Sequence, residues 1–209
     1  QQVYEKNDNY WDTTTIDGNS VFNNLNDLTS FGPVELNSTI QTAGNQSYLG
    51  AATLIGATEI KAAGGSFEGG LVGAGNDLTL NIANTITIAD GSGVNNLTSI
   101  GETILTGTIN TTGSQNYQSD VTIEVDVTIN AGGEVQFSAQ VSGNQNESAD
   151  NPDLIINTQA DTTFGGTVSD LATLTTDNGG STIAKADIAT TGNQTYNDEF
   201  VLNTSLTLT

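Results

Sequence analysis

The feature that most constrains this chain is a nine-residue pattern that occurs three times. Each copy reads Ile-x-Thr-x-Gly-x-Gln-x-Tyr, and the copies begin at residues 40, 109 and 188, which are 69 and 79 residues apart. The alignment continues without a gap through apolar positions, so the matching windows cover residues 40–60, 109–129 and 188–208. Serial repetition of this kind is the signature of stacked-repeat architectures. The chain is therefore expected to be a repeat array.

The local pattern within the repeats is that of β-strands. Val121, Ile123, Val125, Val127 and Ile129 alternate with Thr, Glu and Asp, which predicts one buried and one solvated strand face. Gly, Asn and Asp separate these runs, and no segment shows the 3.6-residue period of an amphipathic helix. The pattern therefore predicts an all-β protein with short strands and frequent turns.

Two observations favour a β-solenoid over a β-sandwich, which remains the alternative fold. The repeat is serial, and its smaller elements recur about every 18–23 residues, a length that suits one coil of two or three short strands. Coils stacked at the strand spacing bring like side chains together, so Asn and Thr ladders are expected. We predict a right-handed parallel β-helix of roughly nine to ten coils over residues 21–209. Residues 1–20 depart from the repeat and are interpreted as an N-terminal cap or assembly segment.

Composition excludes several classes of function. The chain has no His or Cys, so Ser-His-Asp and Cys-His catalysis and the usual zinc sites are ruled out. It carries 24 Asp and Glu against 3 Lys and no Arg, a net charge of −21, so nucleic acid would be repelled. No apolar run approaches the roughly 18 residues of a membrane-spanning helix. We expect no enzyme activity, no cofactor, no nucleic-acid partner and no membrane insertion.

Two segments resemble a known class of repeat. Residues 190–198 read Thr-Thr-Gly-Asn-Gln-Thr-Tyr-Asn-Asp and precede the apolar run 200–202, and residues 163–168 read Thr-Phe-Gly-Gly-Thr-Val and lead into 171–176. They are similar to the repeats of filamentous-haemagglutinin-like large bacterial exoproteins and adhesins. The resemblance covers roughly residues 20–209 and implies a right-handed β-helix that serves as a shaft. The Asn-Pro-Asn-Gly-Ile-type motif of that family's secretion domain is not found in this sequence.

The function expected from these observations is structural. The chain is interpreted as an extracellular or cell-surface bacterial protein, a subunit or segment of a surface fibre, sheath or adhesin. The alternative is a glycan- or ice-binding β-helical module with structural calcium. The third window runs to the end of the sequence, so the expected partner is the chain itself, head to tail, or further repeats of a longer chain. The assembly residues predicted at the two ends are Tyr4, Tyr10, Trp11, Leu206 and Leu208.

Two segments are candidate calcium sites. Residues 73–77 read Gly-Ala-Gly-Asn-Asp and are similar to the Gly-Gly-x-Gly-x-Asp calcium turns of β-rolls, which makes Asp77 a candidate ligand. Glu147, Asp150 and Asp153 place several carboxylates in one polar loop, and calcium prefers oxygen ligands. The competing interpretations are a structural turn at Asp77 and a solvated insertion at residues 144–153.

The Gln and Tyr of the repeated pattern form the third candidate set, which consists of Gln46, Gln115, Gln194, Tyr48, Tyr117 and Tyr196. They recur too rarely to form one continuous ladder or one catalytic site. We predict that each Gln is a corner amide that satisfies buried backbone groups, with the Tyr ring packed beside it.

Overall fold

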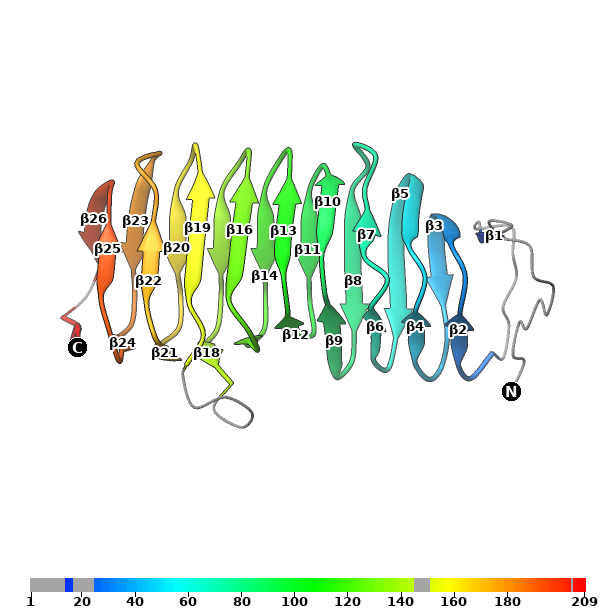
Figure 1. Cartoon of the computed structure of the whole chain (residues 1–209), viewed down its shortest axis with the longest axis horizontal. Helices are drawn as coiled ribbons and strands as arrows, with labels where there is room; N and C mark the ends of the chain where they lie inside the picture. Colours follow the sequence, from blue (N-terminus) through cyan, green and yellow to red (C-terminus); the bar gives the residue numbers. More distant parts are fainter. Residues whose placement is uncertain (1–13, 17–24, 145–150, 204) are drawn as a thin grey trace.

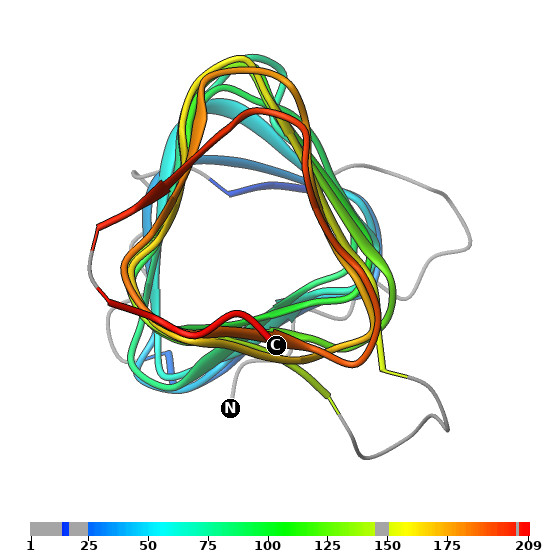
Figure 2. The ribbon, with the colours of Figure 1, turned by 90° about the vertical axis from the view of Figure 1, so that its left-hand side faces the viewer.

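A computed structural model describes residues 14–16, 25–144, 151–203 and 205–209. The described part is all-β, and its strands stack side by side into a rod, with the first and last described strands at opposite ends (Figure 1). Viewed along the rod, the chain winds around a triangular cross-section (Figure 2). Each turn of the chain contributes one strand or strand segment to each of three faces, and every recorded strand pairing is parallel.

The first face is one nine-stranded sheet, so the rod has about nine turns. Its strands are β2 (Leu28–Ser30), β4 (Gln46–Tyr48), β6 (Gly65–Phe67), β9 (Thr85–Ile88), β12 (Glu102–Leu105), β15 (Val121–Ile123), β18 (Val141–Gly143), β21 (Val168–Leu171) and β24 (Ile188–Thr190).

The second and third faces belong to one 17-stranded sheet, because two long strands bend around the edge between them. These are β3 (Val34–Gln41) and β5 (Ala52–Ala62). The second face continues with β1 (Thr14–Ile16), β7 (Leu71–Val72), β10 (Gly91–Val94), β13 (Thr108–Thr111), β16 (Val127–Ala131), β19 (Leu154–Thr158), β22 (Leu174–Thr176) and β25 (Gln194–Tyr196). The third face continues with β8 (Leu78–Ile82), β11 (Leu97–Ser99), β14 (Gln115–Tyr117), β17 (Val135–Phe137), β20 (Thr162–Phe164), β23 (Ser181–Ala184) and β26 (Glu199–Leu202).

These observations confirm the predicted β-solenoid and show that the β-sandwich alternative is wrong. Parallel pairing between successive turns is what a coiled chain produces, whereas a sandwich is built from antiparallel sheets. The predicted cap at residues 1–20 lies almost entirely outside the described residues. None of the described residues forms a helix long and apolar enough to cross a membrane.

The core is a column of inward side chains in which each coil covers the one before it. Aromatic rings stack along this column: Tyr48 on Phe67 with ring centroids 4.8 Å apart, and Tyr117 on Phe137 at 5.2 Å. Phe164 extends the second stack at 5.4 Å from Phe137. Since paired strands are in register, like side chains meet at the strand spacing and exclude water together.

An outward ladder of the predicted kind forms on the second face. Asn130 donates its amide to Oδ1 of Asn110 (2.7 Å), and Asn157 donates to Oδ1 of Asn130 (2.8 Å). Such amide ladders add hydrogen bonds along the rod axis between coils that already share backbone pairing.

The alternation predicted across residues 121–129 is wrong at its centre. β15 ends at Ile123 and β16 begins at Val127, and the chain turns a corner between the first and second faces over residues 124–126. Ile123 and Val127 are buried, but the side chain of Val125 is 49% exposed. The period of two holds only within a straight strand, so a side chain at a corner can turn outward even where the alternation predicts that it is buried.

The sequence repeat and the turn of the solenoid do not coincide. The Gln–Tyr strand lies on the first face in copy one (β4), on the third face in copy two (β14) and on the second face in copy three (β25). Successive copies are eleven strand segments apart, when β5 is counted twice because it contributes to two faces. Four complete turns would need twelve segments. With three strands per turn, each copy is therefore rotated by a third of a turn. The longer second spacing is absorbed mainly by residues 144–153, which connect β18 and β19.

Candidate functional site

The Gln of each repeat lies at a corner and joins three parts of the chain. Gln46 is fully buried, and its Nε2 donates to the carbonyl oxygens of Ile40 and Lys61, both at 3.1 Å. Ile40 ends the preceding face, and Lys61 lies in the next coil. The hydroxyl of Tyr48 donates to Oε1 of the same amide at 2.6 Å. One side chain thus bonds the carbonyls of two coils and one buried hydroxyl.

The other two copies repeat this arrangement on their own corners. Gln115 donates to the carbonyls of Ile109 (3.3 Å) and Asn130 (3.2 Å), and Gln194 donates to those of Ile188 (3.2 Å) and Thr209 (2.9 Å). The hydroxyls of the following tyrosines again donate to the Gln oxygens. These contacts confirm the predicted corner amide. The motif works at any of the three corners, because it depends only on adjacent strands and the next coil.

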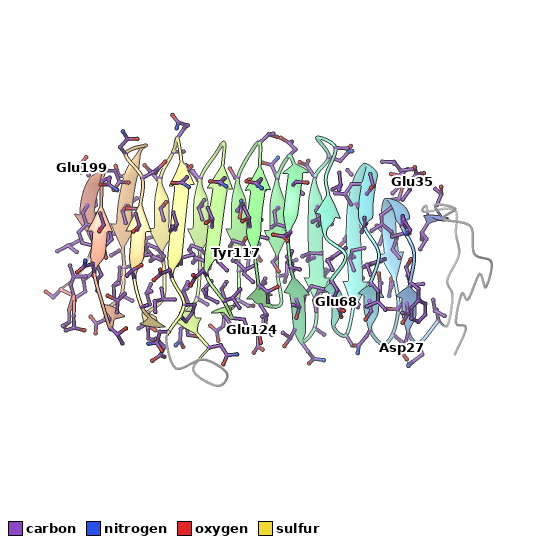
Figure 3. The ribbon with its side chains drawn as sticks, viewed as in Figure 1. Asp27, Glu35, Glu68, Tyr117, Glu124 and Glu199 are labelled. Carbon is purple, nitrogen blue, oxygen red and sulfur yellow. The ribbon has the colours of Figure 1, made fainter. Side chains whose placement is uncertain are left out.

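Burial suppresses acid–base chemistry at these tyrosines. Desolvation raises the pKa of Tyr48 and of Tyr117 far above the usual value, and raises the pKa of Tyr196 to about 12. The three phenols are therefore neutral near pH 7 and act as hydrogen-bond donors to the Gln oxygens. Figure 3 shows Tyr117 within the rod, whereas the labelled glutamates are spread along its length.

Side-chain oxygens at the corners bind one coil to the next, a role that the sequence analysis missed. In each case an Asp or Asn oxygen accepts a hydrogen bond from a backbone N–H about one turn later. The pairs are Asp27 with Asn45 (2.8 Å), Asp77 with Asn96 (3.0 Å), Asp90 with Thr108 (2.8 Å), Asn96 with Ser114 (2.9 Å), Asp120 with Gln140 (3.1 Å), Asp126 with Asp153 (3.0 Å), Asp161 with Ser181 (2.9 Å) and Asp187 with Thr207 (2.7 Å). The sequence signal that could have indicated this role is an Asp or Asn that precedes a strand and recurs at a spacing of about one coil.

Asp77, the candidate from the β-roll-like turn, belongs to this set. Its Oδ1 accepts hydrogen bonds from Nδ2 of Asn95 (2.8 Å) and from both Nδ2 (2.9 Å) and the backbone N of Asn96. Ala74 and Gly75 make the left-handed turn before it, with φ of 49° and 80°. Three donors that converge on one oxygen are what a structural turn would use, so the Oδ1 atom of Asp77 already has a structural role.

The other predicted calcium ligands are not gathered into a site in the described part of the chain. Oδ1 of Asp153 accepts a hydrogen bond from the Thr173 hydroxyl at 2.7 Å. Glu147 and Asp150 lie outside the described residues. Across the residues that the structure describes, no group of three or more acidic side chains is placed to hold a metal ion.

Of the predicted assembly residues, the structure describes only the two at the C-terminal end of the rod. Tyr4, Tyr10 and Trp11 lie outside the described residues. Leu206 is partly buried against the core, and Leu208 is 42% exposed. Leu208 forms a parallel bridge with Ile188 and so begins a further layer on the first face.

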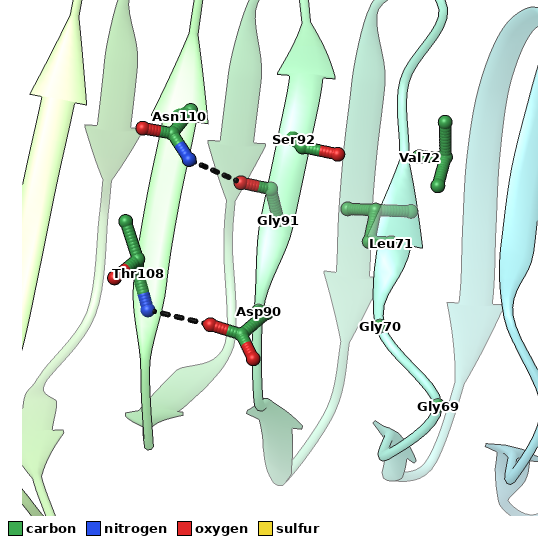
Figure 4. Close-up of a pocket in the computed structure, with 9 residues that line it drawn as sticks. All are labelled: Gly69, Gly70, Leu71, Val72, Asp90, Gly91, Ser92, Thr108 and Asn110. Atoms are coloured by element: carbon green, nitrogen blue, oxygen red, sulfur yellow. Dashed lines mark hydrogen bonds between the residues drawn. The ribbon is translucent and has the colours of Figure 1, made fainter.

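A shallow depression on the second face offers little chemistry (Figure 4). It is lined by Gly69, Gly70, Leu71, Val72, Asp90, Gly91, Ser92, Thr108 and Asn110. The carboxylate of Asp90 is used by the backbone N–H of Thr108, and the Asn110 amide donates to the Gly91 carbonyl at 3.3 Å. Its polar groups therefore hold adjacent coils together and do not converge on the depression.

The fold and its corner motifs define the class of this protein as a parallel β-solenoid. No family model, curated protein or solved structure was found to match the chain.

The corner carboxylates predict a loss of stability in acid. Desolvation raises the pKa of Asp77, but the hydrogen bonds from Asn96 and Asn95 outweigh it, so this pKa lies below its usual value. The pKa of Asp27 is likewise lowered, first by the backbone N–H of Asn45. A carboxylate whose pKa is lower in the folded than in the unfolded chain stabilises the fold. This stabilisation is complete above the pKa of the unfolded chain, about 3.9, and is lost as the pH falls through the pKa of the folded chain.

We therefore expect the melting temperature to fall steeply below about pH 4. Asp77→Asn should lower it at pH 7, and the gap from the natural chain should narrow as the pH falls. Glu134→Gln is the control, since the side chain of Glu134 is exposed. Circular-dichroism melts between pH 7 and pH 2 provide the measurement. A gap that stays constant over this range would contradict the role of the Asp77 carboxylate.

Proposed function

We propose that this chain is a structural segment of a bacterial extracellular fibre, sheath or adhesin, in which the β-solenoid serves as a shaft. The observation that carries the proposal is the one-third-turn rotation between repeat copies. A protein that binds ligands with one face would keep its repeated surface on that face. Here equivalent positions pass in turn to all three faces, which suits a rod that carries load and has no preferred side. The same rotation weighs against the glycan- or ice-binding alternative.

The bonding between coils supports a mechanical role. Successive coils are joined by backbone pairing on three faces, and at some corners also by a Gln amide or a corner carboxylate. Stability in such arrays is approximately a sum over repeats and their interfaces, so the rod can be long without a larger core. The net charge of −21 would keep neighbouring rods apart at low salt. The resemblance to exoprotein repeats supports the extracellular location.

Head-to-tail assembly is the second part of the proposal. Leu202 is 53% exposed and Leu208 42% exposed at the C-terminal end of the rod, where a stacked coil would cover both. A contact between unlike ends does not close on itself and produces filaments.

Electron micrographs of the purified chain should show rods joined end to end, more so at physiological salt, where repulsion is screened beyond about 8 Å. The double variant Leu202→Asp, Leu208→Asp should give single rods, because charge would enter the end contact. Ile155→Asp is the matched control, since Ile155 is 38% exposed on the side of the rod. Single rods from the natural chain at every concentration, or sheets formed side by side, would contradict head-to-tail assembly.

A further inference from the structure

The third copy of the repeat exposes a surface that is covered in the first two copies. Gln46 and Gln115 are fully buried, as are Tyr48 and Tyr117. Gln194 and Tyr196 make the same internal hydrogen bonds but remain partly exposed. Tyr196 stacks on Phe200 of its own coil, with ring centroids 4.1 Å apart, whereas Ala52 and Val121 stand at the equivalent positions of the first two copies. What the third copy lacks is the paired strand that covers the motif in the other two.

The first two copies show what kind of coil covers the motif. In copy one, Gly65 lies opposite Gln46 and Phe67 lies opposite Tyr48. In copy two, Val135 lies opposite Gln115 and Phe137 opposite Tyr117. In both copies an aromatic ring stacks almost parallel on the Tyr ring, with interplanar angles of 15° and 8°. The position opposite the Gln takes a residue without a long side chain.

The strands on either side of the corner after Tyr196 each have an edge that could pair with another coil. β25 pairs with β22, and β26 pairs with β23; within the described part of the chain neither strand has a second neighbour. The other edge of each strand carries backbone N–H and C=O groups in the spacing that a parallel strand requires. Gln194 already donates to Thr209, as Gln115 donates to Asn130, so the chain is in register as far as the first residue of the covering coil.

We propose that the coil formed by residues 194–209 is an acceptor for a parallel solenoid coil that places an aromatic ring over the partly exposed Tyr196–Phe200 pair and a short or β-branched residue on Gln194. The occupant is a coil of this same repeat type. The rotation of one third of a turn between copies also predicts which coils are interchangeable. A coil that covers copy two on the third face fits copy three on the second face, because the motif is the same at every corner. This inference deepens the proposed head-to-tail assembly by naming the chemistry of the joint.

The test extends the chain by a coil that it already contains. The sequence of residues 131–143, which follows Asn130 in copy two, is appended directly after Thr209, the matching position in copy three. In this register the appended copy of Phe137 meets Tyr196. The matched control is the same extension with its copy of Phe137 replaced by asparagine. Amide hydrogen exchange across residues 194–202 reports whether the new coil covers the strand edges.

We expect exchange in residues 194–202 to slow at least tenfold in the extended chain, with a higher melting temperature, and to stay near that of the unextended chain in the control. Equal exchange in the two extensions, or no slowing in either, would overturn the proposal. Electron microscopy of the unextended chain separates this result from the proposed assembly. Protection without end-to-end filaments would support the acceptor coil and reject self-assembly. Filaments without protection in the extended chain would reject the acceptor and leave assembly to another surface.

Discussion

Replacing Ile123 by aspartate should unfold the middle of the solenoid, whereas the same replacement at Val125 should be tolerated. Ile123 is fully buried in a row with Leu105 and Gly143 of the neighbouring coils. An unpaired carboxylate there would cost several kcal/mol. In a chain of this length that corresponds to a fall of about 10 °C or more in the melting temperature. Val125 points outward at a corner, so aspartate would remain hydrated.

Circular-dichroism melts of the two variants at pH 7 make the comparison, and each variant serves as the control for the other. Similar falls at both positions would mean that residues 121–129 form one continuous strand, contrary to the corner at residues 124–126. A fall of less than about 3 °C for Ile123→Asp would mean that this side chain does not face the core.

Replacing Gln115 by methionine should produce the second large effect. Methionine has a similar length but no amide, so the carbonyls of Ile109 and Asn130 and the hydroxyl of Tyr117 would each lose a hydrogen bond. Each buried polar group left unsatisfied costs about 1–3 kcal/mol. We expect a fall of roughly 10 °C in the melting temperature. Local opening of residues 109–137 should also increase, which amide exchange would detect.

Gln136→Met is the control for this variant. Gln136 lies in register beside Asn116 on the outward side of the third face and is exposed, so its loss should change the melting temperature by no more than about 2 °C. If the two variants melted alike, the buried amide would not hold the corner together.

The sequence predicted the fold and the role of the repeated Gln and Tyr side chains, because both depend largely on residues that are close together in the chain. Alternation marks which residues of a straight strand are buried, and this succeeded for Val121, Ile123, Val127 and Ile129. The serial recurrence of short elements at about the length of one coil favoured a solenoid over a sandwich. A Gln–Tyr pair that recurs too rarely for a ladder had to be satisfied within its own corner, and the hydrogen bonds of Gln46 and Gln115 agree.

The candidate sites were less accessible to sequence reasoning. Asp77 was selected by its likeness to a calcium turn, but its carboxylate is used by Asn95 and Asn96, which lie one coil away. The acidic composition suggested repulsion between rods, whereas several of the aspartates also hold adjacent coils together. Such a role depends on a donor that is distant in sequence, so only the spacing of Asp and Asn residues by about one coil could have indicated it.

By itself the sequence determined that the chain would form coils of short strands with a hydrogen-bonded Gln–Tyr pair at a corner of each repeat. Strand alternation depends on neighbouring residues, and each Gln bonds the Tyr two positions after it and the carbonyl six positions before it. The tertiary structure alone decided that three strands make a turn, that successive copies lie on different faces, and that Val125 turns outward while Asp90 reaches Thr108. All of these follow from how one coil rests on the next. That contact joins residues about twenty positions apart, and its geometry is set by the closing of the triangle and not by any local pattern.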